Sequence, residues 1–243
     1  NYCAGLTMTN KKFNRLFNRP PRKPETQITR MDMDLARSIQ TVAEEVMLKV
    51  SRHIHKLTGQ KNLCLAGGVA LNCVANGKIL REGPFDNIWI QPSAGDAGGA
   101  LGAALRVWYK YLGNERIADN AKDSQKGSYL GPEYSDEYIE DYLKTNSIPY
   151  AKFTKEALFQ TVSSYINSEK VIGWLQGRME FGPRALGARS IIGDARSQAM
   201  QSRMNLKIKF RESFRPFAPS VLAEKSGDYF DIKCESPYML LVA

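Results

Sequence analysis

The sequence predicts an α/β fold in two domains, with a mainly parallel sheet covered by helices. Twice in the first half of the chain, a short apolar run is followed by a glycine turn and then by a helix-compatible stretch. This alternation of strand and helix is typical of parallel sheets. Between about Gly113 and Pro132 the chain becomes polar, as a linker would be, and further helix and strand patterns follow it.

A long amphipathic helix is predicted before the first strand. Residues 1 to about 30 are basic and rich in turn formers, and Pro20, Pro21 and Pro24 exclude a continuous helix there. From Asp34 onward, apolar residues recur every three or four positions until Gly59, which is placed to end the helix. These apolar positions are Leu35, Ile39, Val42, Val46, Val50, Ile54 and Leu57.

The first strand–turn–helix unit is the segment LAGGVALN that begins at Leu65. The strand is predicted over residues 62–66 and the helix over residues 70–80. Glycines directly after a strand let the backbone approach a ligand, and free N–H groups there bind phosphate oxygens. A tight structural turn explains the same residues, and the pattern is neither the dinucleotide-binding GxGxxG nor a P-loop. The candidate nucleotide-binding residues here are Gly67, Gly68, Val69 and Asn72.

The second unit repeats this arrangement in QPSAGDAGGALG, which begins at Gln91. A strand over residues 88–90 stops at Pro92, and a helix is predicted from Ala97 to Tyr111. Gly95 and Gly98 are further candidates for nucleotide binding. Asp96, between them, is suited to ligate a cation beside bound phosphates, and it is equally suited to cap the following helix.

The second half of the chain has weaker patterns. Helices are predicted over residues 137–145 and 155–168, and a strand over residues 171–175. The apolar run at residues 239–243 reads as a strand with no turn after it, so the natural protein is expected to continue beyond this point. The opening residues also lack a convincing first element, so a preceding segment is expected as well.

Composition excludes several classes of protein. No apolar run approaches the roughly 20 residues that span a bilayer, and no signal-peptide pattern is present at the start, which favours a cytoplasmic protein. The cysteines have no CxxC spacing, so reduced thiols are expected at Cys3, Cys64, Cys73 and Cys234. The net charge of +9 calls for an anionic partner or ligand. One basic cluster, from Lys11 to Lys23, lies in an N-terminal arm that is read as solvated, and the other runs from Arg178 to Arg215.

The two glycine motifs at this separation resemble the C-terminal half of the ATPase core shared by actin-like (ASKHA) kinases and Kae1-type carbamoyl-handling proteins. In those relatives the GGVA-x-N loop binds adenosine and a later Asp ligates a metal, which implies this role for Asp96. The resemblance implies ATP and Mg²⁺, with Fe²⁺ or another divalent ion at Asp96 if a preceding half supplies the other ligands. The family's His-x-x-x-His pair is absent here, because His53 and His55 are two apart on a helix and cannot converge on one ion.

The strings GRMEFGPRALGARSI, from Gly177, and RPFAPSV, from Arg215, resemble the signature of carbamoyltransferases of the NodU, CmcH and TobZ type. The resemblance covers the chain from about residue 30 to the end. It implies the second half of an actin-like (ASKHA) domain over residues 1–122, followed by a YrdC-like α/β domain over residues 123–243. It also implies that ATP and carbamoyl phosphate form carbamoyladenylate, from which the carbamoyl group passes to a hydroxyl of a small molecule.

Arginine forks match phosphate and carbamoyl oxygens, and several fixed cations are needed to bring two polyanions together. The candidate catalytic residues are Arg178, Arg184, Arg189, Lys207, Arg211 and Arg215, with Lys209 beside them. Ser190 and Asn205 are candidates to donate to phosphate or ribose, and Phe181 or Phe217 to flank a base. For each cation the alternative is a surface charge or a structural ion pair. Glu180 and Glu212 are expected to pair with neighbouring arginines rather than to act as general bases, and Trp89 and Trp174 to lie in the core.

Two other functions compete with small-molecule carbamoylation. RNA binding or tRNA modification is the alternative that the positive charge and the YrdC-like resemblance allow. The arginine-rich signature favours the small-molecule enzymes over it, so a nucleic-acid partner is not expected. A non-catalytic regulator that binds ATP without consuming carbamoyl phosphate is the third class. The sequence predicts neither the acceptor nor the oligomeric state.

Overall fold

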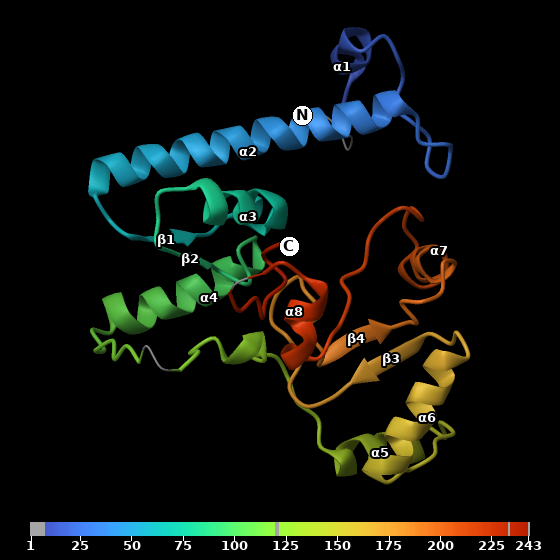
Figure 1. The fold of residues 1–243 in the computed structure, drawn as a ribbon. Coiled ribbons are helices and arrows are strands. Elements are labelled where there is room, and N and C mark those ends of the chain that lie inside the picture. Colours follow the sequence, from blue (N-terminus) through green and yellow to red (C-terminus); the bar gives the residue numbers. More distant parts are fainter. Residues whose placement is uncertain (1–7, 120–121, 233, 243) are drawn as a thin grey trace.

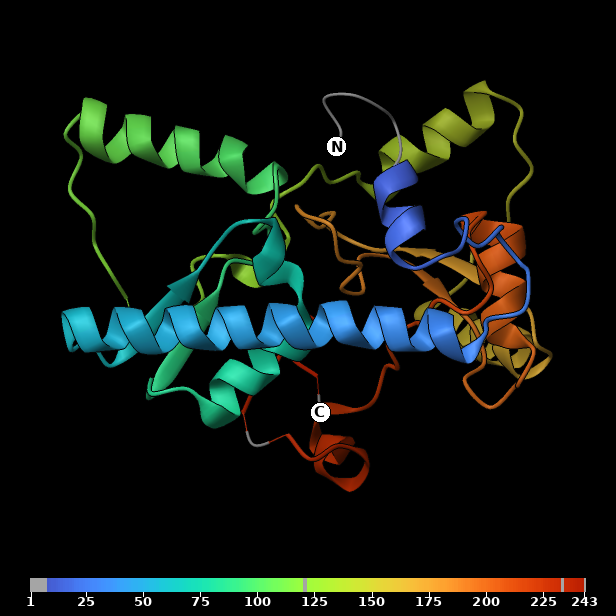
Figure 2. The ribbon, with the colours of Figure 1, turned by 90° about the horizontal axis from the view of Figure 1, so that it is seen from above.

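The computed structural model describes residues 8–119, 122–232 and 234–242, and its fold is mixed α/β with two small sheets. The long helix α2 (Arg30–Thr58) runs along one side of the molecule (Figures 1 and 2). Thr29 and Asp32 form a capping box at its start, and Gly59 ends it in the left-handed conformation, with φ of 62°. The predicted helix is thus confirmed. A short helix, α1 (Lys11–Leu16), forms before the prolines and was not predicted.

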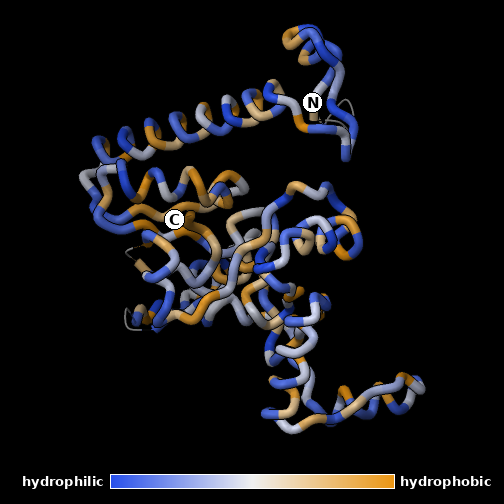
Figure 3. Tube along the Cα trace, turned by 45° about the vertical axis from the view of Figure 1, so that its right-hand side comes forward, coloured by the Kyte–Doolittle hydropathy of each residue, from blue (hydrophilic) through white to orange (hydrophobic). Residues whose placement is uncertain are grey.

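The face of α2 that packs inward is not the face that the apolar repeat suggested. Hydrophobic residues recur along the helix in Figure 3, but Ile39, Val46 and Val50 are more than half exposed. The buried positions are instead Glu44, Leu48 and Ser51. Helical periodicity identifies an amphipathic helix, whereas the neighbouring elements decide which of its sides is covered.

The first half of the chain contains a parallel sheet of two strands, β1 (Asn62–Leu65) and β2 (Asn87–Ile90). A 3₁₀ turn, η1 (Gly68–Leu71), and helix α3 (Cys73–Glu82) connect them, and α3 packs against α2. Helix α4 (Ala97–Arg106) follows β2 and continues as a π-helical segment, η2 (Val107–Tyr111). Figure 1 shows the sheet between α3 and α4. Both predicted strand–turn–helix units are confirmed.

The second half contains the other sheet, formed by β3 (Ile172–Leu175) and β4 (Arg189–Ile192). These strands are antiparallel, so the prediction of a mainly parallel sheet is correct only for the first half. The helices predicted before β3 are confirmed as α5 (Asp136–Thr145) and α6 (Lys155–Asn167). The short helical segments that follow β4 are α7 (Met200–Arg203), the π-helical η4 (Met204–Lys209), η5 (Ala223–Lys225) and α8 (Ser226–Tyr229).

The polar segment between the halves is not a free linker. After η3 (Lys126–Ser128), Gly131 and Met179 are joined by a backbone hydrogen bond of 2.9 Å. The backbone N–H of Phe181 also donates to the carbonyl of Ser128 at 2.7 Å. The segment therefore lies along the loop that follows β3, and it fixes the position of that loop.

The end of the chain completes the core of the first half. Residues 239–242 form no strand, contrary to prediction. Tyr238 and Leu240 are instead buried against Ala70 and Ile90. The fully buried Asn76 side chain donates to the backbone carbonyl of Leu240 at 3.0 Å. The apolar run therefore packs in the core as irregular chain, because no partner strand pairs with it among the described residues. The domain boundary near residue 122 stays a prediction.

Two other findings concern the class of protein. Within residues 8–119, 122–232 and 234–242, no helix is long and apolar enough to cross a membrane. Cys64, Cys73 and Cys234 are free thiols, as expected, and Cys3 lies outside the described residues.

Candidate functional site

The two glycine turns meet in one pocket. The backbone N–H of Gly67 donates to the carbonyl of Ala94 at 2.7 Å, which ties the turn after β1 to the turn after β2. The pocket has a volume of about 690 Å³ and lies between the sheet and α4. Its lining includes Gly67, Gly68, Gly95 and Gly98. The structure thus brings together four of the predicted nucleotide-binding residues, because parallel strands end at the same edge of a sheet.

Glycine is required at two places in this pocket. Gly67 has φ of 101°, which side chains other than hydrogen rarely allow. A Cβ atom on Gly98 would lie 2.1 Å from the carbonyl oxygen of Ser93, so the first turn of α4 packs directly on the preceding loop. By contrast, nothing lies within 4 Å of a Cβ atom built on Gly99.

Val69 and Asn72, the other two residues predicted to bind a nucleotide at the first turn, do not line the pocket. Val69 is exposed and is not among the residues that line the pocket. The side chain of Asn72 caps α3 by accepting from the N–H of Ala75, and it exchanges hydrogen bonds of 3.0 and 3.2 Å with Gln40 of α2. Asn72 therefore connects α2 to the pocket loop. A contact of either residue with a nucleotide stays a prediction.

Asp96 lines the pocket, and its side chain makes no capping hydrogen bond with α4. Of its two predicted roles, the cap is not observed. No group of three His, Cys, Asp or Glu residues that could hold a metal occurs in the described parts of the chain. The ring of His55 packs on Phe85, with centroids 5.3 Å apart. Ligation of a cation by Asp96 stays a prediction.

The loop that carries the arginine signature, residues 177–191, is organised by the buried carboxylate of Glu180. We call this segment the arginine loop. One carboxylate oxygen accepts from the backbone N–H groups of Leu186, Ala188 and Arg189 at 2.7, 2.8 and 3.1 Å. Burial raises the pKa of Glu180, but these backbone donors outweigh it and hold the pKa below the ordinary value. The expected pairing of Glu180 with an arginine side chain is wrong, because backbone amides replace the guanidinium.

The arginine loop docks on the edge of the glycine pocket. The hydroxyl of Ser93, in the second turn, donates to the carbonyl of Phe181 at 2.8 Å. In the other direction, Nη2 of Arg184 donates to the carbonyl of Leu71 at 3.1 Å. The Nε atom of Arg184 is buried and has no hydrogen-bond partner among the described residues. A cation with an unused donor therefore lies beside the first glycine turn.

The other candidates on this loop are more exposed. Arg178 donates to the carbonyl of Gly131 at 2.8 Å and lies 3.8 Å from Glu133. Arg189 is on β4 with its side chain exposed. The hydroxyl of Ser190 accepts from the N–H of Gly187 at 3.1 Å, so it shapes the end of the loop.

A second set of cations lies on residues 207–217, which we call the basic loop. The fully buried Asn205 holds it: its amide donates to the carbonyls of Ser213 and Arg215, and its oxygen accepts from Nε of Arg211 at 2.5 Å. Arg211 also lies over the ring of Phe217, 4.9 Å from its centroid. Asn205 thus positions Arg211, and direct contact of Asn205 with a ligand stays a prediction. Lys207, Lys209 and Arg215 are exposed.

The N-terminal arm contacts this basic loop and is not merely solvated. Arg22 forms an ion pair with Glu212 and lies 5.9 Å from the ring centroid of Phe214. Glu25 accepts from both the N–H and the hydroxyl of Ser213. Sequence reasoning missed this contact, because nothing local in either segment signals a partner so far along the chain. Glu212 does pair with an arginine, but the partner is Arg22 of the arm and not a neighbouring arginine of its own segment, as was expected.

Comparisons with known proteins agree with this arrangement of motifs. Residues 1–105 match the family model described as the carbamoyltransferase N-terminus, and residues 163–243 match the carbamoyltransferase C-terminus. An uncharacterized protein of Synechocystis sp. is 61% identical over 100% of this chain and 40% of its own length. Nodulation protein NolO of Bradyrhizobium diazoefficiens is 41% identical over 89% of this chain and 39% of its own length.

A third relative is named for its enzymatic activity. The 3'-hydroxymethylcephem-O-carbamoyltransferase of Streptomyces clavuligerus is 34% identical over 73% of this chain and 31% of its own length. The chain thus spans about two fifths or less of the length of these relatives. Because the two family models match most of its residues and describe the two ends of one kind of protein, this chain belongs to the carbamoyltransferase family.

Proposed function

We propose that this chain is part of an O-carbamoyltransferase that uses ATP and carbamoyl phosphate to carbamoylate a hydroxyl of a small molecule. The Streptomyces relative supports a hydroxyl acceptor, because its name specifies O-carbamoylation of a hydroxymethyl group. The observation that carries the proposal is the docking of the arginine loop on the glycine pocket through Ser93 and Arg184. In this arrangement the cation Arg184 lies beside the first glycine turn, which is the proposed binding site for phosphate groups.

The proposed reaction has three steps. Hydrolysis of carbamoyl phosphate releases inorganic phosphate and gives carbamate. A carbamate oxygen attacks the α-phosphorus of ATP, the bond to pyrophosphate breaks, and carbamoyladenylate forms. The acceptor hydroxyl then attacks the carbamoyl carbon, AMP leaves with the bonding electron pair, and the hydroxyl proton is lost to solvent.

The residues of this chain would act mainly by binding and alignment. Backbone N–H groups at Gly68 and Gly95 would face phosphate oxygens, and Asp96 would ligate a Mg²⁺ ion carried by the nucleotide. Arg184 would neutralise charge at the same edge, and Arg211 would do so from the basic loop. The division into an actin-like (ASKHA) part and a YrdC-like part belongs to the same proposal.

RNA binding receives less support than this reaction. It depends on net charge, yet several basic side chains are engaged within the protein. Arg22 pairs with Glu212, Arg184 bonds a backbone carbonyl, and Arg211 bonds Asn205. Cations that are engaged in this way hold loops and a small pocket in place. They are less available to bind the phosphates of a nucleic-acid backbone.

The proposal is tested by exchange of labelled pyrophosphate into ATP. The purified chain is expected to catalyse exchange only when carbamoyl phosphate is present. Arg184→Ala and Arg211→Ala should each lower the rate by roughly tenfold or more, since removal of a charged hydrogen-bond donor costs about 1.5–3 kcal/mol. Arg116→Ala, at an exposed arginine of the polar segment, is the matched control and should leave the rate unchanged. Exchange without carbamoyl phosphate, or an equal loss in the control, would contradict the proposal.

A further inference from the structure

We propose that Trp89 forms the surface on which the base of the nucleotide stacks in the glycine pocket. This inference rests on the proposed function, which supplies ATP as the ligand. It adds an aromatic side chain for the base to a pocket in which the glycine turns offer backbone N–H groups. Sequence reasoning placed Trp89 in the core, and the structure contradicts that expectation.

The first observation is where strand β2 directs its side chains. Ile90 is 7% exposed and lies in the core, whereas Trp89 is 46% exposed. Trp89 lines the same pocket as both glycine turns. In the parallel sheet it is opposite Cys64, which is also exposed and lines the pocket. A large flat ring beside a small side chain leaves space above the ring, and an exposed indole face costs free energy unless something covers it.

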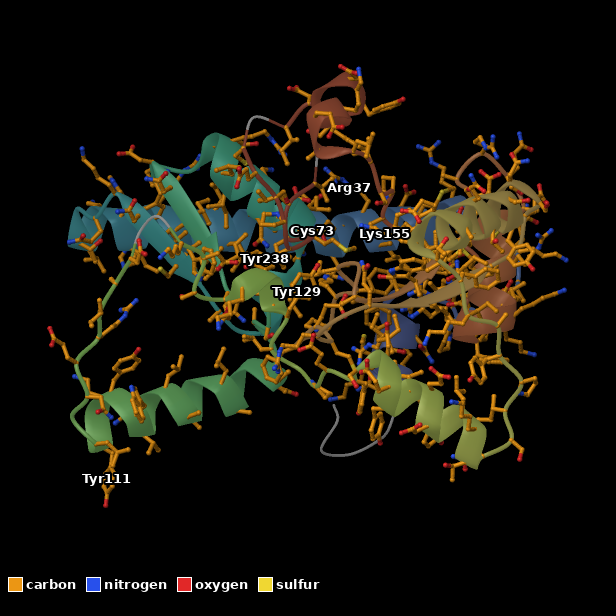
Figure 4. The ribbon with its side chains drawn as sticks, turned by 90° about the horizontal axis from the view of Figure 1, so that it is seen from below. Arg37, Cys73, Tyr111, Tyr129, Lys155 and Tyr238 are labelled. Carbon is orange, nitrogen blue, oxygen red and sulfur yellow. The ribbon has the colours of Figure 1, made fainter. Side chains whose placement is uncertain are left out.

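The second observation is that the ring is held in place. Tyr238 meets the ring of Trp89 edge to face, with centroids 6.1 Å apart and planes at 80°. Tyr238 is buried, and its hydroxyl donates to the carboxylate of Asp123. Asp123 also accepts from the N–H groups of Gln125 and Gly127. Figure 4 shows Tyr238 near the middle of the molecule, away from Tyr111 at the far end of η2. An aromatic ring fixed before the ligand arrives loses little entropy on binding.

The third observation is an unused polar atom near the indole. Gln91, two residues after Trp89, lines the pocket, and its side-chain oxygen is buried without a hydrogen-bond partner among the described residues. A buried acceptor without a donor is costly in a folded protein. The exocyclic amino group of adenine supplies such a donor. One pocket of about 690 Å³ is thus lined by the indole of Trp89, by the side chain of Gln91 and by both glycine turns. This volume suits a nucleotide.

Titration calorimetry of the whole chain with MgATP tests this assignment. Trp89→Ala should weaken ATP binding by about 5- to 150-fold, the loss typical of one stacked base, and Trp89→Phe should weaken it less. Tripolyphosphate, which has no base, should bind all three proteins equally. Trp108→Ala is the matched control, because Trp108 is similarly exposed on η2 but does not line the pocket. It should leave ATP affinity unchanged.

Intrinsic fluorescence gives a second readout that does not depend on the alanine variant folding. ATP should quench the wild-type signal and the Trp108→Phe signal, and the quench should be absent in Trp89→Phe. If the wild type binds ATP and Trp89→Phe binds it equally with the same quench, the inference is overturned while the proposed function stands. If the wild type does not bind ATP, both are overturned.

Discussion

Ser213 in the basic loop donates its backbone N–H and its hydroxyl to the carboxylate of Glu25, at 2.9 and 2.8 Å. These two residues are 188 positions apart in the chain. Because Asn205 holds the other side of the same loop through the carbonyl of Ser213, Arg211 lies in a segment that is fixed from two directions. The N-terminal arm is therefore part of the candidate site's support.

Glu25→Ala is expected to loosen the basic loop. The N–H of Ser213 loses its acceptor, so hydrogen exchange of the peptide over residues 211–215 should become at least severalfold faster. Pyrophosphate exchange should fall with it, because Arg211 is less firmly positioned. Glu45→Ala, which removes an exposed glutamate paired with Lys49, is the control. Unchanged hydrogen exchange at residues 211–215 would show that the arm does not support this loop.

Glu180 should make the stability of the fold sensitive to acid. Its pKa in the folded state is lowered by backbone N–H groups against the opposing effect of burial, so its stabilising contribution is fully present above the unfolded value near 4.5. That contribution is lost as pH falls through the lower, folded-state pKa. Glu180→Gln retains an acceptor oxygen but does not titrate. The difference in melting temperature between wild type and Glu180→Gln should therefore shrink as pH is lowered from 6 toward 3.

Glu180→Ala should lower the stability of the fold far more than Glu180→Gln does. It takes this acceptor from three backbone N–H groups, including that of the buried Ala188, at a cost on the order of 3 kcal/mol. If thermal unfolding shows equal stability for the alanine and glutamine variants at neutral pH, the carboxylate does not organise the arginine loop.

Two helical glycines give a matched pair, Gly98 in the wall of the pocket and Gly227 outside it. Gly98→Ala should distort the pocket, because its Cβ would lie 2.1 Å from a backbone oxygen that cannot move without shifting the turn at Ser93. Gly227→Ala, in α8, meets open space, lies outside the residues that line the pocket and is the control. Calorimetry with MgATP is expected to show weaker binding for Gly98→Ala alone. Equal ATP affinity for the two variants would mean that the pocket does not hold the nucleotide.

Local patterns predicted most elements of the first half. The helix that became α2, both strands of the first sheet and both glycine turns follow from periodicity and from glycine placement, which are properties of short segments. The meeting of Gly67 with Ala94 also follows, because parallel strands bring their ends together. The strand β4 was missed because it lies inside a segment dominated by Arg, Gly and Ser, in which the apolar pattern is short.

What the sequence did not predict depends on contacts between distant segments. The apolar repeat that includes Val46 suggested the inward face of α2, but α3 packs on the helix where Glu44, Leu48 and Ser51 are buried, and Val46 is exposed. Trp89 was expected in the core because it is apolar. Glu180 was expected to pair with an arginine, because nothing in the local sequence shows that three backbone N–H groups will converge on it. Each error comes from assigning a side chain to an environment by its chemistry alone.

The most direct test of the proposed chemistry is to identify which bond of ATP is broken. Phosphorus NMR of the chain with MgATP, carbamoyl phosphate and a hydroxymethyl-bearing acceptor distinguishes cleavage at the α-phosphorus from cleavage at the γ-phosphorus. Carbamoyladenylate chemistry predicts AMP and pyrophosphate, with inorganic phosphate from carbamoyl phosphate, and no consumption of ATP when carbamoyl phosphate is left out. Formation of ADP, or ATP consumption that does not depend on carbamoyl phosphate, would contradict the account.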